Sequence, residues 1–199
     1  PFHRLVAVEG CWRERGIRVT PEGLEEVLLA ELTGPVREAL SGLPGNPPEG
    51  YRIDLPLGAV RLLRTIAEQD WSGLLLAFDY GLSRRVLLHE RPEGTARGYR
   101  RHRMVTNLLE RPGETDITCH LCWEDLEDSL AASGFHAVTV GRQGPFLMKH
   151  AADRIESLLS TGDATTRGSI TELIHPAHLG EKFQVLHGFR RPRDARPGG

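Results

Sequence analysis

The longest apolar run of the chain lies in residues 73–81, where five apolar residues are followed by Asp79, Tyr80 and Gly81. A run bounded by glycines and preceded by a helical pattern is typical of a strand buried on both faces of a parallel sheet. In open α/β sheets the ligand crevice lies beyond the carboxyl ends of such strands. We therefore expect Asp79 and Tyr80 at a functional edge, with Gly81 allowing a tight turn. The alternative is a buried strand followed by an ordinary acidic loop residue.

The segments before this run predict a hairpin, two helices and a short strand. Apolar and charged residues alternate over residues 5–19, which predicts a β-hairpin with one solvated face. Thr20-Pro21 predicts a helix start, followed by the apolar stripe Leu24, Val27, Leu28 and Leu32. A second short helix is expected at 36–40, a loop at 41–50, a strand at 51–55 and an amphipathic helix at 57–70. A helix leading into a buried strand is typical of an α/β fold.

The segments after the run continue the same alternation. Trp123, Leu126 and Leu130 share one face of a predicted helix that ends at Gly134, and a strand follows at 135–140. A helix is expected from Gly144-Pro145 to Leu159, a polar break at 160–168, helical pieces at 169–179 and a last strand at 182–189. We interpret residues 1–189 as a single α/β domain and residues 190–199 as a disordered tail.

Composition narrows the classes of partner. The net charge of −2 does not favour nucleic acid, and no apolar run reaches the length of a membrane span. Three cysteines are too few for a disulfide framework, and no secretory signal precedes the first strand. We therefore expect a cytoplasmic protein that binds neither nucleic acid nor a membrane.

The cysteine pair Cys119 and Cys122 raises the question of zinc. Two thiolates two residues apart can bind one tetrahedral metal ion, but a structural site needs four ligands. His175 and His178 would complete the set only if the fold brought them close. We therefore expect no metal site, and a small metal-binding domain is the weakest alternative.

Two further segments carry candidate chemistry. The basic run Arg97, Arg100, Arg101, His102 and Arg103 could bind phosphate or an acidic partner. If it is a strand, Arg101 and Arg103 face one way while Arg100 and His102 face the other; a solvated edge strand is the alternative. If residues 116–120 are extended, Asp116, Thr118 and His120 share one face and form a polar pocket wall. The sequence contains no serine-hydrolase elbow, phosphate loop or dinucleotide glycine fingerprint.

An ordered set of motifs resembles one protein family. These are PEGYRIDLPLGA, GLLLAFDYG, GTARGYRRHR, RPGETDITCHLCW, RQGPFLM and HPAHLGEKFQVL, in this order along the chain. Together they resemble the MidA-type S-adenosylmethionine-dependent methyltransferases, which include the mitochondrial complex I assembly arginine methyltransferase. Phe78 replaces an isoleucine of the family pattern. Cys119 and Cys122 stand where the family has alanine and aspartate, which removes one carboxylate from the expected pocket.

The resemblance implies a class I, Rossmann-like, seven-stranded methyltransferase sheet. In it, residues 74–79 are the fifth strand, and residues 135–140 and 183–189 are the last two, one of them antiparallel. Pro1, Phe2 and His3 resemble the end of an upstream family motif, so the chain is expected to be the C-terminal half, without the first four strands and the glycine-rich cofactor loop. The fifth strand would then have an open apolar edge, which favours self-association.

The resemblance also implies a reaction: methyl transfer from S-adenosylmethionine to a protein arginine, with a respiratory complex subunit as a candidate substrate. Asp79 and Asp116 would hold the guanidinium, and His102 or His120 would relay a proton. The expected substrate-binding residues are Tyr80, Gly81, Thr118 and Arg100, and the expected cofactor-binding residues are Pro1 and Phe2. Without the glycine loop this chain alone is expected to be inactive. The alternative function is a non-catalytic protein-binding or assembly-factor fragment.

Overall fold

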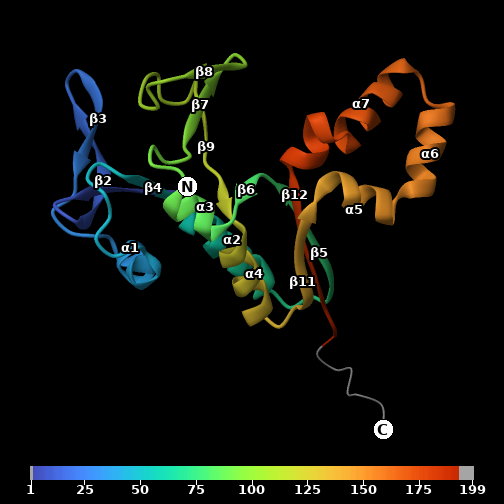
Figure 1. Ribbon diagram of the computed structural model, residues 1–199, viewed down its shortest axis with the longest axis horizontal. Coiled ribbons are helices and arrows are strands. Elements are labelled where there is room, and N and C mark those ends of the chain that lie inside the picture. The colour runs from blue at the N-terminus through green and yellow to red at the C-terminus, as the bar shows by residue number, and fades with distance from the viewer. Residues whose placement is uncertain (1, 193–199) are drawn as a thin grey trace, which may run out of the picture. The chain divides into compact units, whose positions relative to one another are not determined.

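The computed structural model describes residues 2–192, which form two compact units. The first unit comprises Pro1–Arg61 and Leu82–Cys122, and the second comprises Leu62–Gly81 and Trp123–Gly199. Both units contain helices and strands, in agreement with the expected α/β class (Figure 1). The expected disordered tail falls largely on residues 193–199, which lie outside the described residues. No helix of the described chain is long and apolar enough to cross a membrane.

The first unit is built on an antiparallel sheet in the order β3-β2-β1-β4. The strands are β1 (His3–Val8), β2 (Cys11–Thr20), β3 (Gly23–Leu28) and β4 (Arg52–Leu55). The predicted β1–β2 hairpin is confirmed. Its turn residues Glu9 and Gly10 both have positive φ angles, 53° and 73°, as a two-residue turn that follows the strand twist requires.

The helix predicted after Thr20-Pro21 is wrong, because this segment forms β3 and pairs with β2. Proline suits the corner of a turn as well as a helix start, and here Thr20 Oγ1 donates a hydrogen bond to Gly23 O at 3.2 Å across the turn. The Nη1 atom of Arg15 lies 3.0 Å from Glu26 Oε2 on the facing strand. Cross-strand pairing therefore overrides the helical spacing of the leucines.

The core of the first unit lies where the sheet meets helices α1 (Gly34–Ala39) and α3 (Arg84–His89). The loop predicted at 41–50 is confirmed, apart from one short turn, η1 (Leu40–Gly42). Trp12 Nε1 donates to Pro44 O at 2.9 Å and ties this loop to β2. The buried cluster consists of Leu5, Ala7, Trp12, Val36, Ile53, Leu55 and Leu88.

A second, three-stranded antiparallel sheet completes the first unit. Its order is β8-β7-β9, with β7 (Arg97–Arg100), β8 (Arg103–Val105) and β9 (Asp116–Thr118). Gly98 packs so closely that a Cβ atom there would lie 2.8 Å from Val105 Cγ2 and 3.0 Å from Leu108 Cδ2. Short strands β6 (Gly81–Leu82) and β10 (Leu121–Cys122) form a separate two-stranded pair.

The second unit contains a three-stranded sheet in the order β11-β12-β5 (Figure 1). Its strands are β5 (Gly73–Asp79), β11 (His136–Arg142) and β12 (Gln184–Arg190), and β12 is antiparallel to both neighbours. The three strands predicted at 74–79, 135–140 and 182–189 are thus confirmed, with one antiparallel to the others as expected.

The prediction that β5 is buried on both faces of a parallel sheet is wrong. Within the described residues β5 is an edge strand, and its one neighbour, β12, is antiparallel. Leu75 is buried, whereas Leu74, Leu76 and Phe78 on the other face are 58%, 44% and 42% exposed. Helix α4 (Trp123–Ala132) packs on β11 and β12. Both faces of β5 carry apolar residues, but the side chains of Leu74, Leu76 and Phe78 stay exposed.

Arg190 belongs to β12 and not to the tail in which the sequence placed it. It donates to Trp71 O at 2.9 Å through Nε, to Gln69 O at 2.6 Å through Nη2, and also to Ala67 O. Helix α2 (Leu57–Ala67), predicted at 57–70, ends at this point. Arg190 therefore caps the C-terminus of α2 and the turn that leads into β5.

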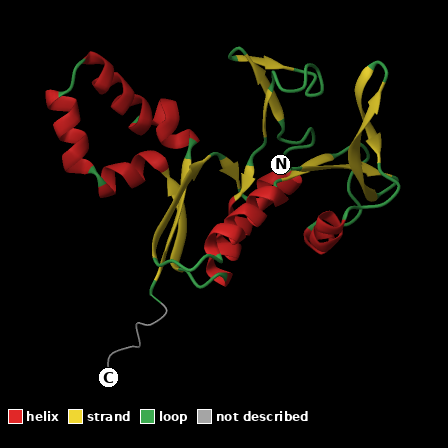
Figure 2. Ribbon diagram, turned by 180° about the vertical axis from the view of Figure 1, so that it is seen from behind, coloured by secondary structure: helices red, strands yellow, loops and turns green. Residues whose placement is uncertain are grey.

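The C-terminal helices are α5 (Gln143–His150), α6 (Ala152–Thr161) and α7 (Ala164–Ile174), followed by a single turn, η2 (Pro176–Gly180) (Figure 2). The single helix predicted from Gly144 to Leu159 is wrong, because the chain bends at Ala151 (φ −138°, ψ 22°). The polar break predicted at 160–168 is also much shorter. Asp163 accepts a hydrogen bond from Thr166 N at 2.7 Å and starts α7 as its N-cap.

Candidate functional site

The residues Asp79, Tyr80 and Gly81 lie at the carboxyl end of β5, in the second unit. Tyr80 N donates to Asp79 Oδ1 at 2.8 Å, and Gly81 N donates to the side-chain oxygen of Gln184 at 3.2 Å. Gln184 faces Asp79 in the register of β12 with β5. The ring of Tyr80 meets that of Phe183 edge to face, with centroids 5.6 Å apart. The turn after β5 is therefore held by its own side chains and by the start of β12.

The Asp79 side chain is half-buried, and its second oxygen, Oδ2, accepts no hydrogen bond from the described residues. One oxygen is thus fixed while the other is available to a ligand. A carboxylate of this kind accepts hydrogen bonds from N–H or O–H groups and attracts a cation. Gln184 and Phe183, which shape this end of the sheet, were not predicted as site residues, because they stand at the start of the last strand and come near Asp79 only through strand pairing.

Asp116 and Thr118 lie in the first unit on one face of β9, as predicted. In the antiparallel register Asp116 faces Tyr99 and Thr118 faces Arg97 across β7. His120 lies beyond the end of β9, and its backbone N donates to Thr95 Oγ1 at 3.2 Å. The strand thus brings together Asp116, Thr118, Tyr99 and Arg97, while His120 is anchored to residue 95 instead.

The predicted alternation of the basic run is wrong, because it is a hairpin and not one strand. Arg100 and Arg103 face each other across β7 and β8. Arg101 and His102 form the two-residue turn between them, with positive φ angles of 50° and 62°. Two-residue turns that match the strand twist need this conformation, which histidine tolerates better than most residues. His102 is therefore an exposed turn residue.

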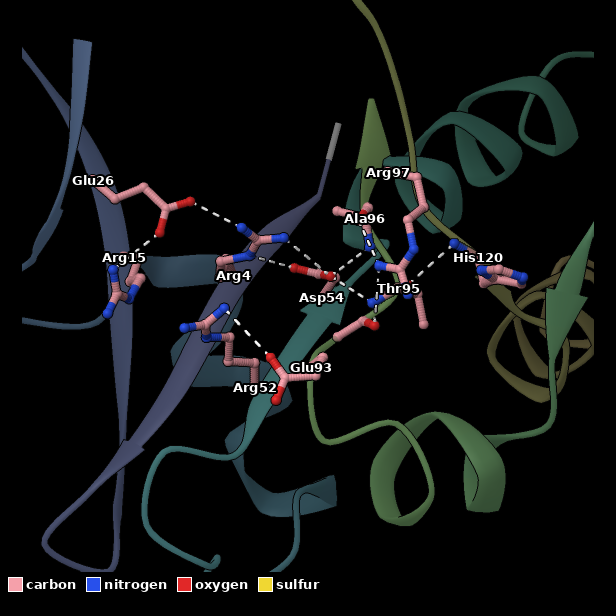
Figure 3. Close-up of polar contacts among 11 residues, drawn as sticks. Arg4, Arg15, Glu26, Arg52, Asp54, Glu93, Thr95, Ala96, Arg97 and His120 are labelled. Atoms are coloured by element: carbon pink, nitrogen blue, oxygen red, sulfur yellow. Dashed lines mark hydrogen bonds and ion pairs between the residues drawn. The ribbon is translucent and has the colours of Figure 1, made fainter. Parts of the chain in front are cut away.

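A buried carboxylate organises the first unit beside these segments (Figure 3). Asp54, on β4, is fully buried and accepts hydrogen bonds from Thr95 N and Ala96 N, both at 2.7 Å. Arg4 Nε donates to the other oxygen of Asp54 at 2.8 Å. Gly94, with φ 69°, comes so close that a Cβ atom there would lie 2.4 Å from Asp54 Oδ2. Asp54 therefore fixes the start of the GTARGYRRHR segment.

Asp54 stands in a short strand that alternates polar and apolar residues, and this local pattern alone does not indicate its burial. Its partner Arg4 is on β1, which is adjacent to β4. Burial alone lowers the pKa of Arg4, but the hydrogen bond and the charge of Asp54, with a further contribution from Glu26, raise it above its ordinary value. The opposite charges of Arg4 and Asp54 on neighbouring strands were the available signal.

The expected cofactor residues lie at the start of the chain. Pro1 is outside the described residues. The guanidinium carbon of Arg4 lies 5.6 Å from the centre of the Phe2 ring, so Phe2 packs against a basic side chain of the first unit. The cofactor role of Phe2 stays a prediction.

The cysteines and histidines considered for metal form no ligand cluster of three or more His, Cys, Asp or Glu side chains in the described part of the chain. Cys11, Cys119 and Cys122 form no disulfide with one another, and Cys122 is buried. The rings of His175, which precedes η2, and His178, which lies in it, have centroids 5.4 Å apart and planes tilted by 57°.

Residues 1–140 match the family model described as "Putative S-adenosyl-L-methionine-dependent methyltransferase". The chain belongs to this methyltransferase family. The match covers all three segments described above, namely the Asp54 strand, the end of β5 and the β7–β9 sheet. S-adenosylmethionine is thus the cofactor of the family.

Solved structures share the fold of this chain. An uncharacterised protein from Burkholderia thailandensis has a TM-score of 0.81 and 22% identity, with 96% of this chain and 52% of that chain covered. A protein from the same organism, bound to S-adenosyl-homocysteine, has a TM-score of 0.82 and 22% identity, with 96% and 50% covered. The chain thus spans about half the length of these structures. No curated protein matches it.

The end of β5 suits the chemistry of the family's cofactor. S-adenosylmethionine presents a positively charged sulfonium, ribose hydroxyls and a flat adenine ring. Asp79 has one carboxylate oxygen that accepts no hydrogen bond from the described residues, and Tyr80, the next residue, has an aromatic ring that packs on Phe183. A carboxylate and an aromatic ring fit a cationic ligand, so these residues are compatible with the cofactor or with a cationic acceptor.

Proposed function

We propose that this chain supplies the acceptor side of an S-adenosylmethionine-dependent methyltransferase that methylates a protein arginine. The observation that carries the proposal is the family match over residues 1–140, which includes the Asp79-Tyr80-Gly81 turn. Arginine as the acceptor, a respiratory complex subunit as its protein and the MidA-type subgroup rest on the motif resemblance. The cytoplasm is the proposed compartment.

Asp79 is the proposed partner of the acceptor guanidinium. When bound, the cofactor supplies a methyl group on a positively charged sulfur. The protein's own contribution is orientation, because the displacement needs the acceptor nitrogen in line with that group. A guanidinium pairs with a carboxylate through two parallel hydrogen bonds, and the hydrogen bond from Tyr80 N at 2.8 Å fixes the carboxylate in advance.

The acceptor nitrogen must lose a proton as the methyl group is added. In the first unit we assign acceptor contacts to Asp116, Thr118 and Arg100, and proton relay to His120 in preference to His102. His120 is held by its hydrogen bond to Thr95 Oγ1 at 3.2 Å, whereas His102 lies exposed on a turn. A His120→Gln variant that keeps full methylation would remove His120 from the reaction.

The proposal includes the C-terminal-half assignment, which the motif resemblance suggests. Calorimetric titration with S-adenosylmethionine tests it. The complete gene product is expected to bind the cofactor, and residues 1–199 alone are expected to give no binding heat. Binding by residues 1–199 would contradict the half-site proposal, and no binding by the complete gene product would contradict the methyltransferase proposal.

Binding without catalysis is the second candidate function, and one observation favours it. Leu74, Leu76 and Phe78 of β5 and Phe189 of β12 form an apolar row on one sheet face, each 42–58% exposed. The edge of β5 also has no paired strand among the described residues.

We propose that a second copy of the chain covers this edge. Light scattering is expected to show a dimer that Leu76→Lys weakens, and a monomeric parent chain would refute self-association.

A further inference from the structure

The β7–β8 hairpin and the loop after it enclose a groove of about 710 Å³ in the first unit. Its walls include Arg100, Arg101 and Arg103 from the hairpin and Arg111 and Glu114 from the loop, and Met104 and Val105 add apolar surface. The loop packs directly on the hairpin, since a Cβ atom on Gly98 would lie 3.1 Å from Thr115 Cγ2. The groove is thus built by two segments of one unit.

The charges of the groove are only partly neutralised. Arg100 Nη1 lies 3.2 Å from Glu110 Oε1, and Arg111 Nη1 lies 3.5 Å from Glu114 Oε2. Arg101 and Arg103, in contrast, form no ion pair or hydrogen bond through their side chains with the described residues. Two uncompensated guanidinium groups therefore remain on a surface that also carries exposed apolar side chains.

The backbone presents one of these arginines in an unusual way. Arg101 has a φ of 50°, in the left-handed region that L-residues other than Asn, Asp and Gly seldom adopt. The two-residue turn between β7 and β8 requires this conformation at both of its residues. The turn places Arg101 between Arg100 and Arg103, which face each other across the two strands.

From these contacts we propose that the groove, with Arg101 and Arg103 as its free cations, binds an acidic segment of a partner protein. Guanidinium groups pair with carboxylates, and Met104, which lines the groove and is 64% exposed, offers a contact for an apolar side chain of the same segment. A groove of about 710 Å³ is far larger than a single phosphate group needs. Mixed charge and apolar surface therefore favour a peptide over an inorganic anion.

The test is fluorescence anisotropy with the whole chain and no cofactor, so its outcome is independent of methyl transfer. The probe is a fluorescein-labelled peptide of alternating glutamate and leucine, compared with the same peptide carrying glutamine for glutamate. The double variant Arg101→Gln with Arg103→Gln is expected to weaken binding of the acidic peptide about tenfold or more. Arg13 and Arg91 are exposed and outside the groove, so Arg13→Gln with Arg91→Gln is the control for the same change of charge.

The proposal requires three results together: binding of the acidic peptide, at least tenfold weaker binding of the glutamine peptide and loss of affinity in the groove variant alone. Equal loss in the control variant would show attraction by overall charge and would overturn the proposal. Inorganic phosphate is added at the same concentration of negative charges as the peptide carries. If it displaced the peptide, the groove would be assigned to a phosphate ligand and the proposal would be overturned. Equal binding of both peptides would also contradict it.

Discussion

Replacing Asp54 with asparagine tests the internal organisation of the first unit. In the native chain Asp54 Oδ2 accepts hydrogen bonds from Thr95 N and Ala96 N, while Oδ1 accepts from Arg4 Nε at 2.8 Å. If the asparagine oxygen keeps the two backbone hydrogen bonds, its NH₂ group faces the Arg4 N–H group. Two donors then oppose each other in a site with 0% exposure.

The expected cost follows from the burial of the pair. Breaking a buried ion pair by removing one charge costs about 3–5 kcal/mol, because the remaining charge stays buried. The Arg4 side chain is 14% exposed and keeps one partner, Glu26, at 2.9 Å, so the lower half of that range is expected. Domains are stable by about 5–15 kcal/mol, so Asp54→Asn removes a substantial share of the stability.

Urea unfolding followed by circular dichroism measures the free energy, and hydrogen exchange at Thr95 N and Ala96 N reports the local change. The matched variant is Glu26→Gln, which removes the carboxylate that pairs with both Arg4 and Arg15 at a site that is 26% exposed. This variant is expected to lower the free energy of unfolding by about 1 kcal/mol or less. If Asp54→Asn cost no more than Glu26→Gln, the assignment of Asp54 as the central buried anion would be refuted.

Three further predictions follow from other contacts. Burial raises the pKa of Glu14, but hydrogen bonds from Thr33 and His3 outweigh it and the pKa is lowered. Its stabilisation is therefore present above the unfolded pKa, about 4.3, and lost as the pH falls through the folded pKa. Thermal unfolding of Glu14→Gln is expected to show a shallower loss of stability in acid than the parent, and identical acid slopes would contradict this. Arg190→Lys is expected to lower the free energy of unfolding in urea by about 2–4 kcal/mol, since one ammonium cannot reach all the carbonyls that Arg190 binds. If its effect were as small as that of Arg191→Lys at an exposed position, this cap would not matter for stability. Changing Arg101 to asparagine and His102 to glycine is expected to stabilise the hairpin by about 1–2 kcal/mol, because both positions have positive φ angles, while weakening peptide binding; no gain in thermal stability would contradict the turn conformation.

Local pattern located β5, α2, α4 and β12 because each has a strong apolar signal of its own. The local pattern does not show which elements are neighbours in the fold. Leu75 of β5 faces Gly188 of β12, so the pairing joins segments that are far apart in sequence. Whether a strand is covered on one face or two depends on such distant partners, and the apolar run alone led to the wrong expectation for β5.

The second limit lies in patterns that fit two structures equally well. Leu24, Val27 and Leu28 have helical spacing, yet pairing with β2 makes this segment a strand. Arg101 and His102 look like the middle of a strand, yet they are the turn of a hairpin. In both cases contacts with a neighbouring strand outweigh local propensity, which differs by only a fraction of a kcal/mol per residue.

For the candidate site, the sequence located the Asp79-Tyr80-Gly81 turn and the shared face of Asp116 and Thr118. It did not reveal Gln184, which faces Asp79, or Asp54, which holds the backbone of Thr95 and Ala96. These residues act through hydrogen bonds across strands, and no local motif marks them.

The measurement that tests the central claim most directly is methyl transfer by the complete gene product and its Asp79→Asn variant. The complete gene product or its variant is incubated with tritiated S-adenosylmethionine and with a lysate of cells that lack the gene, which supplies the substrate proteins. The labelled proteins are then hydrolysed and analysed for methylarginine. Asparagine keeps the oxygen that accepts the Tyr80 N hydrogen bond but loses the charge, and Asp70→Asn removes a charge just before β5 as the control. The account predicts labelled methylarginine with the parent and the control, and a fall of about 100-fold with Asp79→Asn, because the acceptor loses its orientation. Label on other residues, or an unchanged rate in Asp79→Asn, would contradict it.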